Sequence, residues 1–141
     1  MNTIQQQLSK INALKLYHID IYLPQHLIEQ VLTIMQSDNF IFSKHLRDGI
    51  NRDYKHEITL QNVDKYVKLM KRHNIYPFEV ETQFDAITKF CIRWSDDNGY
   101  DVVLAFAPIE NGVLVKTCWR NHFKDLHISL DRSKYEIKEG E

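Results

Sequence analysis

The chain has 141 residues, 43% of them hydrophobic, so it is long enough to bury one core and is neither disordered nor collagen-like in composition. It lacks an apolar run near the roughly 20 residues that cross a bilayer, and segment 1–7 lacks the basic and apolar regions of a signal peptide. These features exclude a membrane-spanning chain, and we expect a single domain over 1–141, a cytoplasmic protein and no membrane partner.

The first half of the chain, about 1–76, is predicted to be mainly helical. Segment 4–16 can be interpreted as a helix, whereas 16–23 contains a run in which apolar and polar residues alternate as in a strand. Apolar residues recur at helical spacing in three later segments, two of which begin at a serine or threonine that can cap a helix. The helices predicted in this way are 25–36, Ser43–Arg52 and one that begins after Thr59 and includes Met70.

After Pro77 the hydrophobic period changes from that of a helix to that of a strand. The strands predicted from this period are 78–81, 87–94, 102–109 and 113–121, with turns at 96–99 and 110–112. Short connections between sequential strands predict an antiparallel meander, and the preceding amphipathic helices are expected to cover one of its faces. We therefore expect an α+β fold, with N-terminal helices packed on a four-stranded antiparallel sheet at about 77–135.

The same periodicities assign side chains to faces and to the core. Along the last strand, alternation predicts one face with Val113, Val115, Thr117 and Trp119 and the other with Leu114, Lys116, Cys118 and Arg120. The residues that we expect to be mainly buried are Leu46, Ile50, Val63, Val67, Val103 and Ala105.

The net charge of −1 conceals an uneven distribution of charge along the chain. Segment 44–72 has eight basic and four acidic residues, segment 73–111 has two and seven, and segment 112–135 has five and two. The two basic segments are candidates for one electropositive site for nucleic acid, if the fold brings them together. The alternative is that both are ordinary solvated surfaces.

Chemistry that depends on a metal, a cofactor or a disulfide has no support in the sequence. Cys91 and Cys118 lie in strand-like runs without CxxC spacing and are expected to be buried thiols. The histidines without paired zinc-ligand spacing are His18, His26, His56 and His73. Glycine-rich motifs for phosphate or dinucleotide binding are also absent. We expect no metal and no cofactor.

The segment Ser43–Arg52 combines a core pattern with a chemical one. Two stripes run along the predicted helix, one of Phe42, Leu46 and Ile50 and the other of His45, Gly49 and Arg52. Gly49 weakens such a helix by roughly 1 kcal/mol relative to alanine, which indicates that a ligand or a packed strand approaches the backbone there.

This segment resembles the barnase, EndoU, colicin and RelE superfamily of metal-independent endoribonucleases, which includes RNA-targeting toxins. Residues 43–52 match, position for position, the pattern S-x-H-L-x-D-x-x-x-R of the RegB endoribonucleases of T4-like bacteriophages, in which the histidine is catalytic. Beyond the start of the next helix, the likeness is only in the order of elements. The resemblance implies a RelE/barnase-like fold and a phage- or toxin-type hydrolase that cleaves RNA.

The resemblance also suggests partners for His45 elsewhere in the chain. RegB enzymes have a second catalytic histidine on the following helix, and Lys68 takes the best-fitting position here. His127, in the segment 121–127, is the other candidate for this role. The last strand ends with Thr117-Cys118-Trp119-Arg120-Asn121, which is similar to the threonine-plus-aromatic ending of related toxins.

Cleaving RNA without a metal requires a base for the 2′-hydroxyl, cations for the pentacoordinate phosphate and an acid for the 5′-oxygen. Histidine serves either proton role near neutral pH, and an aromatic ring can stack on an unpaired base. The catalytic candidates are His45, Arg52, Arg120, His127 and Lys68, and the RNA-binding candidates are Lys44, Thr117, Trp119 and Asn121. We expect Arg52 and Arg120 to face one phosphate. His45 and Trp119 also have purely structural interpretations.

The sequence therefore predicts an endoribonuclease that cuts single-stranded RNA and leaves a 2′,3′-cyclic phosphate, with RNA and a host or inhibitor protein as partners. The alternative is a catalytically inactive interaction protein that binds a host protein or nucleic acid on the same scaffold. Geometry distinguishes the two, because an active enzyme needs His45, an arginine and a polar residue of the last strand in one cleft.

Overall fold

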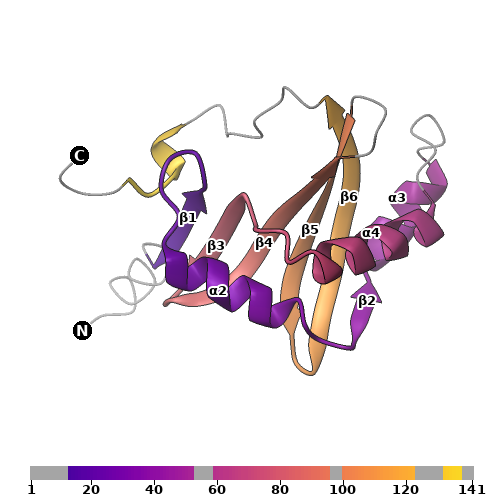
Figure 1. Ribbon diagram of the computed structural model, residues 1–141, viewed down its shortest axis with the longest axis horizontal. Coiled ribbons are helices and arrows are strands. Elements are labelled where there is room, and N and C mark those ends of the chain that lie inside the picture. The colour runs from indigo at the N-terminus through magenta and orange to yellow at the C-terminus, as the bar shows by residue number, and fades with distance from the viewer. Residues whose placement is uncertain (1–12, 53–58, 96–99, 123–131, 138–141) are drawn as a thin grey trace, which may run out of the picture.

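The computed structural model describes residues 13–52, 59–95, 100–122 and 132–137, which form a sheet with helices along one face (Figure 1). Its elements are β1 (Leu14–His18), α2 (Gln25–Ile34), β2 (Phe40–Phe42), α3 (Lys44–Arg52), α4 (Leu60–Arg72), β3 (Glu79–Gln83), β4 (Ala86–Ser95), β5 (Tyr100–Ile109), β6 (Gly112–His122) and the 3₁₀ helix η2 (Arg132–Lys134). Within these residues, six strands form one sheet in the order β1-β3-β4-β5-β6-β2. Every neighbouring pair is antiparallel except β2 and β6, which run parallel.

The second half of the chain follows the sequence prediction. Its four expected strands are present as β3 to β6, and they pair in sequence as an antiparallel meander. The turn at Asn111 is also present, and Asn111 has a φ of 65°. The predicted turn at 96–99 lies outside the described residues. The molecule thus combines helices and an antiparallel meander, as an α+β fold requires.

The sequence prediction of a four-stranded, wholly antiparallel sheet is wrong. β1 and β2 come from the first half of the chain and form the two edges of the sheet. β1 replaces the end of the helix suggested for 4–16, and the part of that segment before residue 13 lies outside the described residues. β2 has only three residues, too few to show a strand period, and it forms because it can pair with Val113–Val115 of β6.

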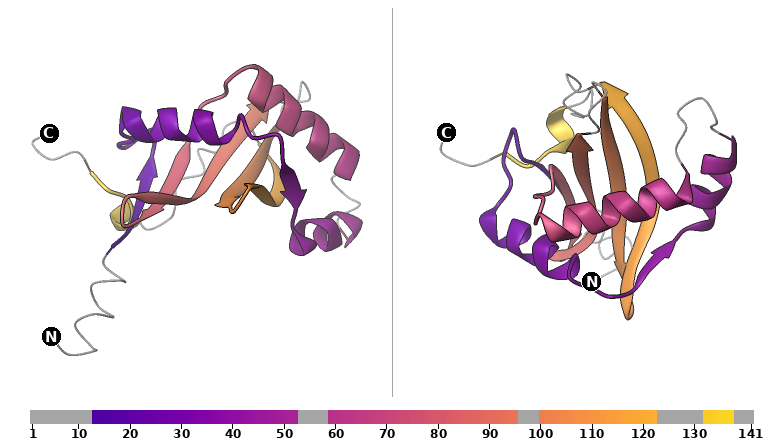
Figure 2. Two further views of the ribbon diagram at one scale, coloured as in Figure 1. Left: turned by 90° about the horizontal axis from the view of Figure 1, so that it is seen from below. Right: turned by 45° about the vertical axis from the view of Figure 1, so that its right-hand side comes forward.

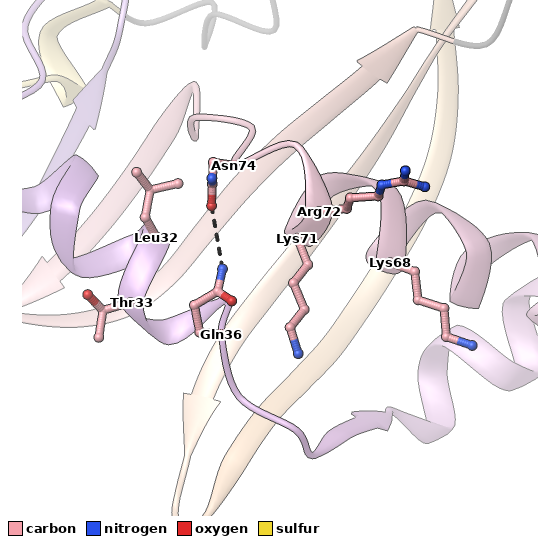
Figure 3. Close-up of a pocket in the computed structure, with 7 residues that line it drawn as sticks. All are labelled: Leu32, Thr33, Gln36, Lys68, Lys71, Arg72 and Asn74. Atoms are coloured by element: carbon pink, nitrogen blue, oxygen red, sulfur yellow. Dashed lines mark hydrogen bonds between the residues drawn. The ribbon is translucent and has the colours of Figure 1, made fainter.

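The helices α2 and α4 lie on the same face of the sheet, whereas α3 lies near its β2 edge (Figure 2). As predicted, Thr59 caps α4, because its Oγ1 accepts the Asn62 N–H at 3.2 Å. The ends of α2 and α4 are joined by a weak bond from Gln36 Nε2 to Asn74 Oδ1 at 3.5 Å (Figure 3). In the described part of the chain, no helix is long and apolar enough to span a membrane.

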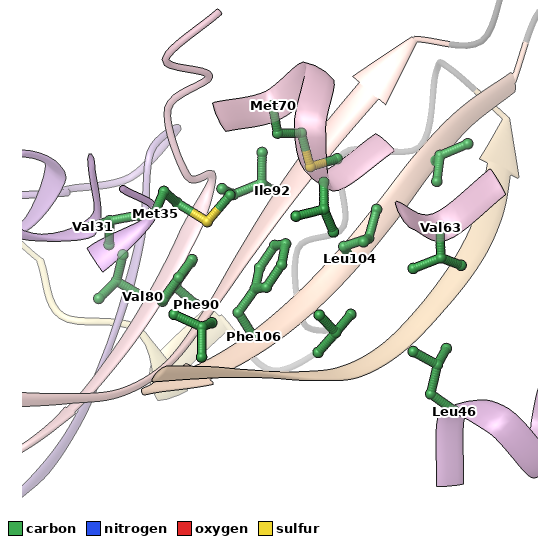
Figure 4. Close-up of a cluster of buried hydrophobic side chains, with 14 of the residues drawn as sticks. Val31, Met35, Leu46, Val63, Met70, Val80, Phe90, Ile92, Leu104 and Phe106 are labelled. Carbon is green, nitrogen blue, oxygen red and sulfur yellow. The ribbon is translucent and has the colours of Figure 1, made fainter. Parts of the chain in front are cut away.

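The main core fills the space between the helices and the sheet (Figure 4). At its centre the ring of Phe90 stacks on that of Phe106 with centroids 5.2 Å apart, and Phe40 meets Phe106 edge-on at 6.2 Å. The residues correctly predicted to be buried are Leu46, Val63, Val67, Val103 and Ala105. The side chain of Ile50 lies outside the described residues.

A smaller apolar cluster lies on the opposite face of the sheet. It consists of Phe78, Cys91, Val103 and Ala105, with Trp119 packed against it. Toward β1, the buried Tyr135 donates its hydroxyl hydrogen to Glu79 Oε2 at 2.7 Å and packs edge-on against the buried His18. The C-terminal segment around Tyr135 therefore covers the β1 side of this face.

Both cysteines are free thiols, as the sequence predicts; Cys91 is buried and Cys118 is partly buried. Cys91 belongs to the smaller cluster and Cys118 packs against the main core, so the two side chains lie on opposite faces of the sheet. Burial raises the pKa of each thiol from 9.0 to about 12. Neither thiol is therefore ionised near neutral pH.

Core packing around Phe106 is expected to dominate stability. Phe106→Ala should lower the free energy of unfolding by about 3–5 kcal/mol, because it removes a fully buried ring and leaves a cavity. Phe84→Ala is the matched control, because Phe84 is 63% exposed, and it should change the value by less than about 0.5 kcal/mol. Urea unfolding of both variants measures the difference. Equal losses would contradict the assigned core.

The raised pKa values of the two thiols predict that the free energy of unfolding falls at alkaline pH. Because the folded state keeps each thiol proton to a higher pH than the unfolded state, unfolding becomes more favourable as pH rises above 9.0 toward about 12. Between about pH 8 and pH 10, each thiol should lower the free energy of unfolding by about 1.4 kcal/mol. Urea unfolding should show a smaller fall in the Cys91→Ala/Cys118→Ala variant. An unchanged fall would assign it to other groups.

Candidate active site

Ser43 fixes the start of α3 against β6. Its N–H donates to the Val115 carbonyl at 3.0 Å, and its hydroxyl donates to the Lys116 carbonyl at 2.7 Å. The same Oγ accepts the Leu46 N–H at 3.0 Å, which confirms the predicted N-cap. A single side chain therefore satisfies one of the open amides of α3 and ties its first turn to the neighbouring strand.

Adjacent residues of α3 face different surroundings. Leu46 is 2% exposed and belongs to the main core, as its stripe predicts. His45, which precedes it, is exposed and lines a cavity together with residues of β4, β5 and β6. The core contact of Leu46 thus holds the helix while the imidazole of His45 stays accessible.

A β-bulge in β6 shapes the opposite wall of this cavity. Ala105 of β5 pairs with Thr117, but the next residue, Phe106, pairs with Val115, so Lys116 is the extra residue of β6. In a regular strand, consecutive side chains point to opposite faces. Here Lys116 and Thr117 are consecutive and both line the cavity.

The cavity has a volume of about 270 Å³ and a cationic lining. Its lining residues among those described are Ser43, His45, Lys89, Ala105, Lys116 and Thr117. These residues carry one imidazole, two ammonium groups, two hydroxyls and the methyl group of Ala105, and this described set contains no carboxylate. Such a set favours an anionic ligand, because the ammonium groups donate to its oxygens while the imidazole can exchange a proton.

The structure brings two of the predicted site residues together and places a third nearby. His45 and Thr117 line the same cavity. Trp119 packs against the smaller apolar cluster, which includes the cavity residue Ala105. Lys44 is exposed at the start of α3, next to His45, and is not among the lining residues.

Two predicted residues lie on the other face of the sheet. Arg120 pairs across the sheet with Val102, a residue of the main core, so it lies on the side of α2 and α4. Lys68 lies on α4 and forms an ion pair with Asp64 at 2.8 Å. The face assigned to Thr117 by simple alternation is also corrected, because the bulge at Lys116 separates Thr117 from Val115.

Three other candidates cannot be placed in the site. The side chains of Arg52 and Asn121, at the ends of α3 and β6, lie outside the described residues, and so does His127. The two basic segments do not converge as a whole. Lys116 from the second segment meets His45 from the first, while Lys68 lies on the opposite face.

Sequence reasoning missed both ammonium groups of the cavity. Lys89 was not predicted as a site residue because it falls in the acidic segment. Its alternation with Cys91 and Arg93 nevertheless places it on their face of β4. Arg93 itself forms an ion pair with Asp101 on β5. Simple alternation placed Lys116 and Thr117 on opposite faces, and only the bulge brings Thr117 to the face of Lys116.

The structure thus contains a cationic cavity with a histidine, on the face of a mixed sheet that α2 and α4 do not cover. Among the described residues, no group of three or more histidine, cysteine or acidic side chains is arranged to hold a metal ion. Comparisons with protein-family models, curated proteins and solved structures find no match to this chain.

Ser43 is expected to affect both stability and the position of His45. Ser43→Ala should lower the free energy of unfolding by about 1–2 kcal/mol, because it removes a helix cap and the bond to the Lys116 carbonyl. Thr59→Ala is the control, because it removes the cap of α4 without touching the cavity. Imidazole NMR signals of His45 should shift only in Ser43→Ala. An equal shift in both variants would contradict the proposed anchor.

Proposed function

We propose that the cavity binds the phosphate backbone of single-stranded RNA and that the protein is a metal-independent endoribonuclease of the phage or toxin type. One observation carries this proposal: the imidazole of His45 shares a cavity with the ammonium groups of Lys89 and Lys116 and the hydroxyl of Thr117. These are groups that can move a proton and neutralise a phosphate. The resemblance of Ser43–Arg52 to a catalytic histidine helix supports the same function.

In the proposed reaction, His45 accepts the proton of the ribose 2′-hydroxyl, whose oxygen then attacks the adjacent phosphorus. The P–O5′ bond breaks and the 5′-oxygen takes a proton from water. The hydroxide that this leaves takes the proton back from His45, and a 2′,3′-cyclic phosphate remains. Lys89 and Lys116 stabilise the additional negative charge on the phosphate oxygens as the new bond forms. In this scheme lysine takes the role that the sequence suggested for Arg52 and Arg120.

A substrate base is proposed to lie beside the phosphate site, next to Trp119. The ring packs against the cluster that adjoins the cavity floor, and Trp119 is partly exposed. Stacking on an aromatic ring is the usual way in which proteins hold unpaired bases. The proposed RNA substrate is also compatible with the expected cytoplasmic location, which stays a prediction together with the host or inhibitor partner.

The second candidate function is RNA or protein binding without cleavage. It is favoured by the composition of the cavity, because histidine is the only residue type in its described lining that commonly transfers protons near neutral pH. A nuclease that uses one imidazole must rely on water or a lysine for the other proton transfer. The measurement of cleavage distinguishes the two functions directly.

Removal of His45 tests the catalytic role. His45→Ala should lower the rate of RNA cleavage by roughly 10²- to 10⁴-fold, with no change in the main core, and excess chelator should have no effect on the wild type. His26→Ala is the matched control, because His26 is exposed on α2 and lines a different pocket. Cleavage by the folded His45→Ala protein at the wild-type rate would remove this residue from the mechanism. Failure of the wild type to cleave would support the binding function.

Removal of the ammonium groups tests phosphate binding. Lys89→Gln and Lys116→Gln should each weaken binding to single-stranded RNA and lower the salt dependence of the binding constant by about 0.7 in its logarithmic slope. Lys65→Gln is the matched control, because Lys65 is exposed on α4 and does not line the cavity. Fluorescence anisotropy over a salt series gives these slopes. Slopes that remain at the wild-type value would place the phosphates elsewhere.

A further inference from the structure

A second cationic surface lies between α2 and α4, on the opposite side of the sheet from the His45 cavity. It is a groove of about 700 Å³, lined by Lys68, Lys71 and Arg72 of α4, by Leu32 and Thr33 of α2, and by Gln36 and Asn74, which follow the two helices (Figure 3). Its residues do not overlap with those of the cavity. The groove therefore needs an explanation that does not depend on the proposed RNA cleavage.

The lining of the groove is positively charged but does not form a pocket for one small anion. Its three cationic residues are accompanied by neutral side chains, and no acidic residue lines it within the described part of the chain. The ammonium groups of Lys68 and Lys71 and the guanidinium of Arg72 point in different directions (Figure 3). Separated charges of this kind match an extended polyanion, because each cation can meet a different anionic group.

Carboxylates of the chain itself already meet two of these cations. Lys68 Nζ lies 2.8 Å from Asp64, and Lys71 Nζ lies 3.6 Å from Asp38. The side chains of Asp38 and Asp64 are largely exposed, so both ion pairs are in contact with water. Exposed pairs of this type contribute little to stability. A carboxylate of a partner can therefore replace Asp38 or Asp64 at small cost.

The neutral part of the groove favours a polypeptide over a nucleic acid. The side chains of Thr33, Gln36 and Asn74 offer donors and acceptors of the kind that bind a peptide backbone. No aromatic ring is among the described residues that line the groove, whereas grooves for single-stranded nucleic acid usually combine positive charge with stacking rings. We propose that this groove docks an acidic, extended segment of a partner protein.

A labelled peptide that alternates glutamate and serine provides the probe, because alternate side chains of an extended chain point to the same side. Fluorescence anisotropy should show binding that weakens as salt rises. The Lys68→Gln/Arg72→Gln variant should bind the peptide roughly three- to tenfold more weakly. Lys71 is left unchanged, because it donates a hydrogen bond to the Ser37 carbonyl at 2.9 Å and so contributes to the fold.

Matched controls make the outcome specific. Lys65→Gln should bind the peptide like the wild type, because Lys65 lies on α4 outside the groove. A peptide with glutamine in place of glutamate should not bind. Absence of binding to the acidic peptide, or an equal loss in Lys65→Gln, would overturn the proposal.

Displacement of the peptide by single-stranded RNA, with the same loss in Lys68→Gln/Arg72→Gln, would assign the groove to nucleic acid instead. Because the readout is peptide binding, its failure is distinct from a failure of RNA cleavage.

Discussion

The parallel pairing of β2 with β6 is the constraint on which the candidate site depends. At the start of β2, Val113 N–H donates to the Asn39 carbonyl at 2.9 Å, and a Cβ at Gly112 would lie only 2.6 Å from that same oxygen. At the end of β2, Ser43 bonds to β6 and caps α3. The short strand is thus fixed at both ends, and α3 has to begin beside Lys116. Because the side chain of His45 is exposed, its position is set by these contacts of β2 and Ser43 and not by burial of the imidazole.

The bulge at Lys116 complements this constraint from the other side. It places an ammonium group and the hydroxyl of Thr117 on the same wall, opposite the first turn of α3. The same irregularity places Cys118 and Arg120 on the side of the main core, so β6 contributes to two different environments along its length. Bulges often re-aim side chains in this way at functional sites. A regular β6 would give a continuous apolar face but would not place Lys116 and Thr117 together.

Long periodic segments made much of the fold predictable from sequence, whereas short and long-range features did not. α2, α4 and the strands β3 to β6 each span enough residues for their hydrophobic period to be recognised. β2 has three residues, and its partner in β6 lies far along the chain, so no local pattern indicates it. His45 and Thr117 were found by residue type and motif, while Lys89 and Lys116 became site residues only through pairing and the bulge. Arg120 was predicted to be a site residue, but the bulge places it on the face of the main core.

The sheet and its core separate the two cationic surfaces electrostatically. The cavity around His45 and the groove between α2 and α4 lie on opposite faces, and a helix layer alone is about 10 Å across. This thickness exceeds the Debye length of about 8 Å at physiological ionic strength, so exposed charges on one surface interact little with a ligand on the other. Occupation of one surface therefore leaves the binding free energy of the other almost unchanged, unless the backbone itself moves. The element that could transmit such a movement is the short connection from α2 through Asn39 and β2 to Ser43, because Gln36 lines the groove and Ser43 lines the cavity.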